Sequence, residues 1–316
     1  MHRWLCWLLV GLLSGCAAGP STQSLCPSET AAPNAQTSEA ADPAPHAAEV
    51  ASPTALVRIE RGRPNRFLDG TGRIFGVPQQ LLYWNRRVNN HQVSAKTEQL
   101  VAEYLLANDL PEVLVRVNQY APLAEWKRLK ANRRIGAGWR YTVGVFDLLL
   151  YTLIPGRLFG DDWYNPFTDT INLYSDVPSI ALHEAAYAKD VHHRRYPGTY
   201  VTIQHVPVIG MWYRTNATAD TLQYLKQHGY NKAELQEADE ILYPMYGGAA
   251  GGQIGKFIPL PFIDIALNLA GTGVGHVVGR YRAHQDRAEE STVETQQKGG
   301  EINKTSPPAQ SQPQPQ

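Results

Sequence analysis

The sequence contains little cysteine and has no excess of charge of either sign. It has 3 cysteines among 316 residues, and its 29 lysine and arginine residues balance 29 aspartate and glutamate residues. Nucleic-acid binding therefore has no electrostatic support. The apolar stretches 4–13 and 247–283 are too short or too interrupted by polar residues to form a membrane-spanning helix. No repeat of about 20 to 50 residues is visible, which argues against a solenoid.

The N-terminus is typical of an exported protein. A basic residue precedes the apolar run 4–13, and residues 13–16 read Leu-Ser-Gly-Cys. This tetrad resembles the lipobox of bacterial lipoproteins, whose cysteine is diacylated before the signal peptide is removed. The resemblance implies a signal peptide over residues 1–15 and a lipid anchor on Cys16, and Ala17 in place of aspartate implies the outer membrane. The alternative is an ordinary secretory signal that is cut slightly later.

Both ends of the mature chain are expected to be disordered. Residues 16–54 and 284–316 are polar and rich in small residues or proline, so they bury too little apolar surface to offset the entropy of ordering. The first is interpreted as a lipidated tether that holds the folded part on the order of 30 Å from the lipid. Because Cys6 leaves with the signal and Cys16 is acylated, Cys26 is expected to be an unpaired thiol without a disulfide partner.

Between these ends, the spacing of apolar residues predicts a mainly helical domain with few strands. Apolar residues three and four apart predict helices over residues 77–88, 95–109 and 122–134. Alternating valines predict a half-buried strand over residues 112–120. The segment 139–155 is too apolar for the surface, and we expect a buried strand that continues into a helix.

A short strand is expected to lead directly into the helix that carries the most informative motif. The strand covers residues 170–174, and Pro178 is suited to the first turn of the next helix. Ser175 and Asp176 are the candidate N-terminal caps of that helix.

The motif in this helix is a consecutive histidine and glutamate, His183 and Glu184, followed by Tyr187. On a helix, His183 and Tyr187 lie in one stripe, and Glu184 lies about a third of a turn away. Zinc hydrolases use this geometry, because two ligands one turn apart hold the ion and a nearby carboxylate deprotonates the bound water. His192 and His193 are too far along the helix to share that ion, and we expect them to be solvated or capping residues.

Residues 172–200 read NLYSDVPSIALHEAAYAKDVHHRRYPGTY. They resemble a group of bacterial zincin-like metallopeptidases in which His-Glu-x-x-His-Ala-x-Asp follows a similar Tyr-Ser-Asp strand end. The resemblance implies that His183 is the first zinc ligand and Glu184 the general base, with Tyr187 where the second histidine should be. Asp220 is the candidate third ligand. In such peptidases an edge strand beside the cleft shortly precedes the metal helix.

Three interpretations of this helix remain open. In the first, a zincin-like scaffold has lost zinc and keeps His183 and Glu184 as a buried hydrogen-bonded pair. In the second, a metal site persists with altered ligation. In the third, the match is a coincidence. We favour the first, and with it an α+β fold, a mostly helical zincin-like domain over residues 55–246 with a small sheet.

The segment 247–283 is expected to be a glycine-rich helical extension. Glycines recur every four residues in two series, at 247, 251 and 255 and at 271, 275 and 279. Small residues at this spacing let helices approach closely. Two readings are open: a hairpin that touches a membrane or self-associates, and a pair of segments packed tightly within their own domain. His276 is expected to be packed rather than a ligand.

Together these patterns predict a lipid-anchored lipoprotein of the outer membrane whose zincin-like domain is a non-catalytic binding or structural module. No cofactor is expected in that case, and the partners are the membrane, through Cys16, and an envelope protein or peptide. The first alternative is a zinc-dependent metallopeptidase with Glu184 as base and with His183, Tyr187 and Asp220 as ligands. The second is a glycine-zipper protein that associates with membranes.

Overall fold

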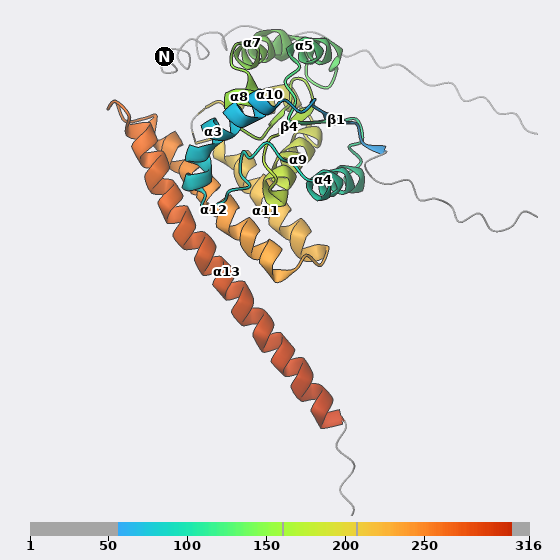
Figure 1. Ribbon diagram of the computed structural model, residues 1–316, viewed down its shortest axis with the longest axis vertical. Helices are drawn as coiled ribbons and strands as arrows, with labels where there is room; N and C mark the ends of the chain where they lie inside the picture. The colour runs from blue at the N-terminus through green and yellow to red at the C-terminus, as the bar shows by residue number, and fades with distance from the viewer. Residues whose placement is uncertain (1–55, 160, 207, 305–316) are drawn as a thin grey trace, which may run out of the picture. The chain divides into compact units, whose positions relative to one another are not determined.

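The computed structural model describes residues 56–159, 161–206 and 208–304, which are mostly helical with one small sheet (Figure 1). The α+β prediction is thus confirmed at this level. The expected signal peptide, Cys16, Cys26 and the tether lie outside the described residues, as do residues 305–316. The described helices and strands follow one another as β1 (Ile59–Arg61), α3 (Arg66–Leu82), α4 (Ala95–Ala107), β2 (Leu114–Val117), α5 (Pro122–Ala131), α6 (Ala137–Trp139), the π-helical turn η2 (Arg140–Gly144), α7 (Val145–Leu153), α8 (Gly156–Phe159), β3 (Trp163–Asn165), β4 (Thr170–Leu173), α9 (Pro178–His192), α10 (Pro197–Ile203), α11 (Met211–Gln227), α12 (Lys232–Gly255) and α13 (Ile263–Lys304).

The sheet has four strands in the order β1-β2-β4-β3. β1, β2 and β4 are parallel, and β3 pairs antiparallel with β4 at one edge. All four residues of β2 and of β4 are buried, as is usual for central strands of a parallel sheet that is covered on both faces. The strand expected over residues 112–120 therefore exists, but the prediction that it is half-buried was wrong.

β2 is fully buried because the charge on its one ionic residue is paired. The Arg116 side chain is 1% exposed, and its Nε donates to Glu125 Oε1 at 2.9 Å. Its Nη1 donates to Glu60 Oε2 and to Gln119 Oε1, both at 2.8 Å. These partners come from three other segments, so the alternation of β2 alone does not reveal them.

The segment expected to be a buried strand and helix is helical up to Leu153 and partly exposed, which corrects that prediction. Residues 137–153 form α6, η2 and α7, and Leu149 and Leu153 are 45% and 75% exposed. Gly144 explains the buried side of the segment. A Cβ at this position would lie 2.8 Å from the ring of Phe167 and 3.0 Å from the side chain of Leu129, so only glycine permits this approach.

Two helix starts also differ from prediction. α3 begins at Arg66, well before residue 77, because the Asn65 side chain accepts hydrogen bonds from two backbone N–H groups of the first turn at 3.1 Å. α9 begins at Pro178 as predicted, but no side chain caps it. Asp176 instead accepts from the backbone N–H and hydroxyl of Ser94, at 2.9 and 2.7 Å, and so supports the start of α4.

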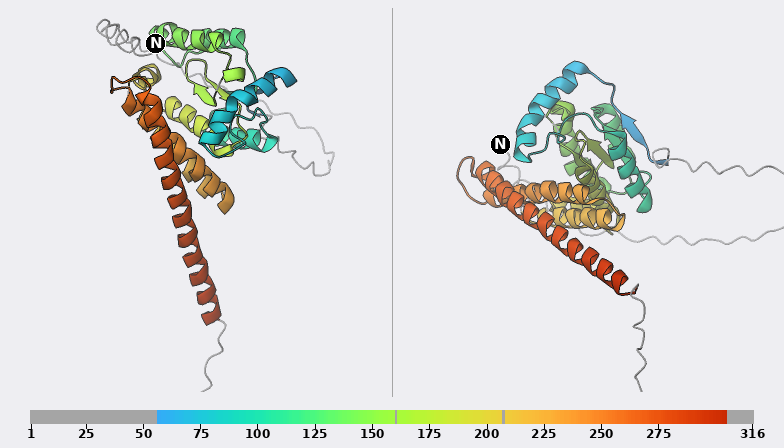
Figure 2. Two further views of the ribbon diagram at one scale, coloured as in Figure 1. Left: turned by 60° about the vertical axis from the view of Figure 1, so that its left-hand side comes forward. Right: turned by 60° about the horizontal axis from the view of Figure 1, so that its bottom comes forward.

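α12 and α13 form a tightly packed antiparallel hairpin (Figure 2). A Cβ on Gly247 would lie 2.2 Å from the Gly271 carbonyl oxygen, and one on Gly251 would lie 1.9 Å from that of Leu267. The glycines of each series thus lie against the backbone of the other helix, which supports the reading of segments packed within their own domain. α12 crosses residue 246, the expected boundary of the zincin-like domain. α13 continues to Lys304, through residues 284–304, where a disordered tail was expected.

Candidate functional site

His183 and Glu184 form a buried pair on α9 that also holds the edge strand β3. His183 Nδ1 lies 3.1 Å from Glu184 Oε1, and the two residues are 3% and 8% exposed. Glu184 Oε2 accepts a hydrogen bond of 2.8 Å from the backbone N–H of Tyr164 in β3. Glu184 therefore satisfies a backbone donor of the sheet edge and ties β3 to the helix.

Tyr187 lies one turn after His183 and is enclosed by aromatic rings. It is 8% exposed, and its hydroxyl donates to Gln204 Oε1. Its ring is perpendicular to that of Tyr164, with centroids 5.5 Å apart, and lies 4.2 Å from that of Tyr213. Burial raises the pKa of Tyr187 well above its ordinary value, so the phenol is neutral. A neutral phenol is a poor zinc ligand beside an imidazole.

Asp220, the candidate third ligand, has other partners. Its carboxylate accepts from Lys189 Nζ at 2.8 Å and from the hydroxyl of Tyr104 in α4. Within the part of the chain that the structure describes, no three histidine, cysteine, aspartate or glutamate side chains are grouped so that they could hold a metal ion. The Asp220 carboxylate and the Tyr187 hydroxyl therefore have protein partners of their own.

Sequence reasoning missed the role of His192. Its side chain is 3% exposed, and its Nε2 lies 2.8 Å from Asp169 Oδ1, which also accepts from the Tyr164 hydroxyl at 2.7 Å. The expectation of a solvated or capping residue was wrong for His192. His193 is exposed, and its Nδ1 lies 2.7 Å from the Lys189 carbonyl oxygen, which agrees with a helix-terminal role.

Arg214 of α11 brings a positive charge to this region. Its guanidinium carbon lies 5.2 Å from the centroid of the Tyr213 ring. Burial by itself lowers the pKa of Arg214, but Tyr213, Glu184 and Asp161 raise it above its ordinary value. Asp161 is exposed on one side. Protein atoms that surround the rest of its carboxyl, and the neighbouring charge of Asp162, raise its pKa to about 7. A guanidinium therefore supplies positive charge beside Glu184.

A second carboxyl with a raised pKa, that of Asp147 in α7, predicts a pH effect on stability. Burial raises its pKa from 3.8 to about 6, against the lowering effect of a hydrogen bond with Asn165. A raised pKa in the folded state contributes stability that is present below about pH 4 and lost as the pH rises through about 6. Asp147→Asn is expected to raise the free energy of unfolding at about pH 7.5 by about 1 to 2 kcal/mol, discounted for partial exposure.

Chemical denaturation of Asp147→Asn and wild type between about pH 4.5 and 7.5 checks this expectation. The difference between the two should grow with pH. A difference that stays constant over this range would show that Asp147 does not titrate with a raised pKa.

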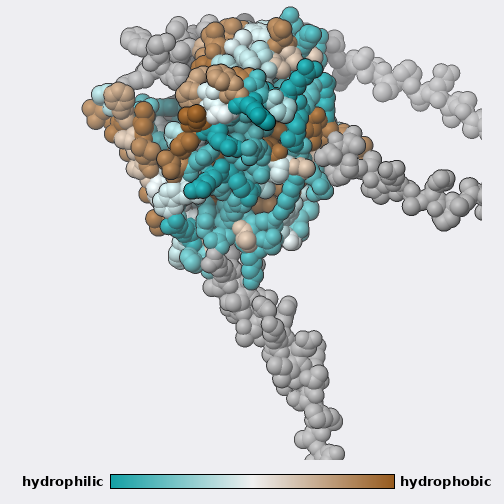
Figure 3. Space-filling view, viewed as in Figure 1, coloured by the Kyte–Doolittle hydropathy of each residue, from teal (hydrophilic) through white to brown (hydrophobic). Residues whose placement is uncertain are grey.

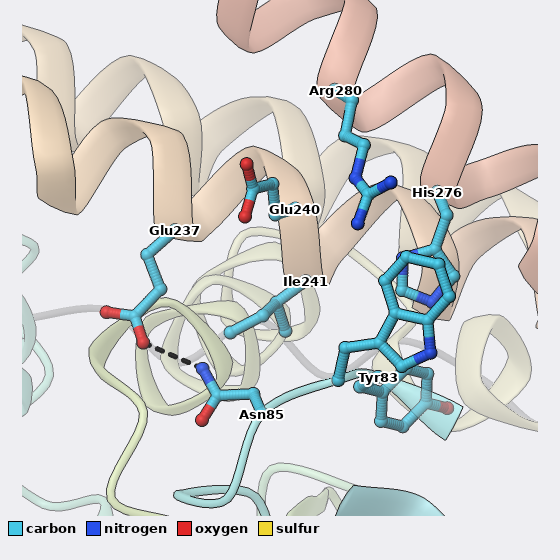
Figure 4. A pocket seen from close by; sticks show the side chains of 8 residues that line it. Tyr83, Asn85, Glu237, Glu240, Ile241, His276 and Arg280 are labelled. Atoms are coloured by element: carbon cyan, nitrogen blue, oxygen red, sulfur yellow. Dashed lines mark hydrogen bonds between the residues drawn. The ribbon is translucent and has the colours of Figure 1, made fainter. Parts of the chain in front are cut away.

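A pocket of about 140 Å³ lies between the loop after α3 and the α12–α13 hairpin (Figure 4). Trp84 forms one wall: its ring stacks on His276 with centroids 4.2 Å apart, and the Arg280 guanidinium lies 4.4 Å from its centroid. Glu237 and Glu240 reach toward the pocket from α12 (Figure 4). This volume suits a single side chain or a small polar group.

The pocket was not foreseen from the sequence, because its residues come from three distant segments and form no motif. Trp84 has a φ of 52°, an uncommon conformation for a residue other than glycine, asparagine or aspartate. This conformation ends α3 and turns the indole toward the hairpin. His276 is packed, as predicted, and its Nε2 donates to the Leu82 carbonyl oxygen at 2.8 Å.

None of the helices in the described ranges is long and apolar enough to cross a membrane. No protein-family model matches the chain. Searches of curated proteins and of solved structures found no match either.

Proposed function

We propose that this chain is a lipid-anchored lipoprotein of the outer membrane whose zincin-like domain binds or supports another envelope component and does not hydrolyse peptides. The observation that carries this proposal is the bonding of Glu184. One of its oxygens faces His183 Nδ1 and the other accepts from the Tyr164 N–H. A carboxylate in this arrangement is a structural link between α9 and the sheet edge.

The contacts of Glu184 compete with a role as general base. A general base must lie within hydrogen-bond reach of the water it deprotonates. Here both oxygens of Glu184 have partners: Oε1 lies 3.1 Å from His183 Nδ1, and Oε2 accepts from the Tyr164 N–H. Any movement of Glu184 that broke the second bond would leave a buried backbone donor unsatisfied, which costs about 1 to 3 kcal/mol. Tyr187 also argues against hydrolysis, because its hydroxyl is neutral and donates a hydrogen bond to Gln204, so it is a poor zinc ligand.

The order of elements supports the zincin-like part of the proposal. The antiparallel edge strand β3 is followed by β4 and then by α9, which contacts both strands. The strand expected to be the edge strand before this helix, residues 170–174, is β4 and lies inside the sheet between β2 and β3, and the edge strand is β3, one strand earlier. The lipid anchor is supported by the sequence of residues 13–16 and remains a proposal, together with the outer membrane as its location.

The proposal predicts how substitutions at Glu184 act. Glu184→Ala is expected to lower the free energy of unfolding by about 1 to 3 kcal/mol, because the Tyr164 N–H loses its acceptor. Glu184→Gln is the matched control, since its amide oxygen can still accept from that N–H, and it should lose clearly less. Urea denaturation of the three proteins measures both effects.

Zinc content, measured on protein purified without chelator, completes the test. Wild type is expected to hold no stoichiometric zinc. One zinc per chain in wild type that is lost in His183→Ala, with unchanged stability of Glu184→Ala, would overturn the proposal and favour the metallopeptidase alternative. Gain of zinc in Tyr187→His alone would support a site that was disarmed at this position.

A further inference from the structure

The end of the α12–α13 hairpin carries a concentration of exposed apolar side chains. Six large apolar residues within residues 254–269, which we call the hairpin tip, are each more than half exposed: Ile254, Phe257, Leu260, Phe262, Ile265 and Leu269. Figure 3 shows apolar surface over this end of the molecule. Only two charged residues, Lys256 and Asp264, occur in the tip.

The packing of the hairpin explains why these side chains point outward. The inner faces of both helices are occupied by glycines that bring the backbones into contact, as at Gly255, where a Cβ would lie 2.4 Å from the Asp264 Cα. Such an interface has no room for large side chains, so the leucine, isoleucine and phenylalanine residues of the tip project away from it. Gly273, on the outer side of α13, has nothing within 4 Å of a Cβ position.

The apolar surface continues from the tip onto the loop before α11. A Cβ on Gly210 would lie 3.9 Å from Gln253 Nε2, which places this loop beside the end of α12. Val208, Ile209 and Trp212 of the same segment are 55%, 46% and 64% exposed. Contiguous apolar surface of this kind on a folded protein marks an interaction site.

We infer that the hairpin tip inserts into the headgroup and acyl boundary of the bilayer that holds the proposed lipid anchor. The tip lies at the end of a helical hairpin (Figure 2), and its phenylalanines and aliphatic residues suit the first 5 to 10 Å of a bilayer, on the order known for interfacial helices. Lys256 and Asp264 lie at the base of the loop and can face the lipid headgroups.

This inference rests on the proposed function, because the anchor supplies the bilayer. If residues 16–54 form the expected tether, the domain stays on the order of 30 Å from the lipid. Insertion of the tip is then an intramolecular event at high effective concentration, so a weak interfacial affinity is sufficient. A bilayer accepts a projecting apolar end without a complementary groove, whereas a second copy of the chain must supply one.

Site-directed spin labelling of the full-length lipidated protein in phospholipid vesicles tests the inference. In a Cys26→Ser background, Phe262→Cys places a label in the tip, and Leu123→Cys places one at a residue that is 79% exposed on α5. We expect the access of a water-soluble nickel chelate to the tip label to fall at least about threefold in vesicles relative to the α5 label, because the tip enters the lipid boundary. Both positions are exposed, so neither substitution should impair folding.

Three outcomes separate the explanations. Equal access of the chelate to both labels would overturn the inference. Protection of the tip label that depends on protein concentration and needs no lipid would also overturn it, in favour of a second copy of the chain. Mass spectrometry of the mature N-terminus reports on Cys16 independently, and an unacylated cysteine would overturn the proposed anchor. In that case, flotation of the unacylated protein with added vesicles tests whether the hairpin tip binds lipid without an anchor.

Discussion

Arg116→Met is expected to lower the free energy of unfolding by about 3 to 5 kcal/mol, because it leaves a buried carboxylate without its partner. Glu125 is 1% exposed, and its Oε1 accepts from Arg116 Nε at 2.9 Å. Thr170 Oγ1 lies 3.2 Å from the same oxygen and cannot compensate for the lost charge. Urea denaturation at neutral pH measures the loss.

A double substitution separates pairing from packing. Arg116→Met combined with Glu125→Leu removes both charges together, and replacement of a buried ion pair by apolar residues is often nearly neutral. We therefore expect the double variant to be more stable than Arg116→Met alone. If the two losses simply added, the pair would not be coupled and the assigned role of Arg116 would be wrong.

Gly251→Ala is expected to destabilise the α12–α13 hairpin by about 3 kcal/mol, the upper end for overpacking of a tight interface. The new Cβ would lie 1.9 Å from the Leu267 carbonyl oxygen, far inside any tolerated contact, and the obstacle is backbone that cannot rotate away. The helices must separate, so hydrogen exchange of the α13 amides should accelerate along with the loss of stability.

Gly273→Ala is the matched control in the partner helix. Its Cβ meets nothing within 4 Å, and alanine is a better helix former than glycine by roughly 1 kcal/mol. This variant should be as stable as wild type or slightly more stable. Equal destabilisation by both substitutions would show that helix propensity or an outside partner, rather than contact between α12 and α13, determines the glycine pattern.

Elements with local signals were predicted well from the sequence. α4 begins at Ala95 because Ser94 caps it, and α9 begins at Pro178, whose ring suits a first helical turn. β4 over Thr170–Leu173 also matches its prediction. In each case, the residues that determine the boundary lie within a few positions of it.

Features that depend on distant partners were not predicted. The full burial of β2 rests on Glu60 and Glu125, and the close packing of the helical residues 137–153 on the domain rests on how Gly144 meets Phe167. Asp176, expected to cap its own helix, supports α4 instead. Each of these contacts joins a residue to a different element of the fold, which the periodicity of one element does not report.

The candidate site was predicted in part. The sequence placed His183 and Glu184 together as a buried pair, which the structure shows, but it gave no sign that the Tyr164 backbone is the second partner of Glu184. Nor did it indicate the position of Arg214 or the pocket at Trp84, because both depend on how α11, α12 and α13 pack. Asp220 was chosen from its place in the sequence alone, and the structure gives it Lys189 and Tyr104 as partners.

The parallel sheet has a consequence for the order in which the chain folds. Its pairs join Ile59 to Val115 and Leu114 to Thr170, so each pairing closes a loop of about 56 residues. Gly247 and Gly271, which meet in the hairpin, are only about 24 residues apart. The entropic cost of closing a loop grows with its length and must be met before the contacts form. The hairpin is therefore expected to form early and the sheet late. We therefore expect Arg116 and Glu125 to stay hydrated until β1 pairs with β2, and to be buried together in that late step.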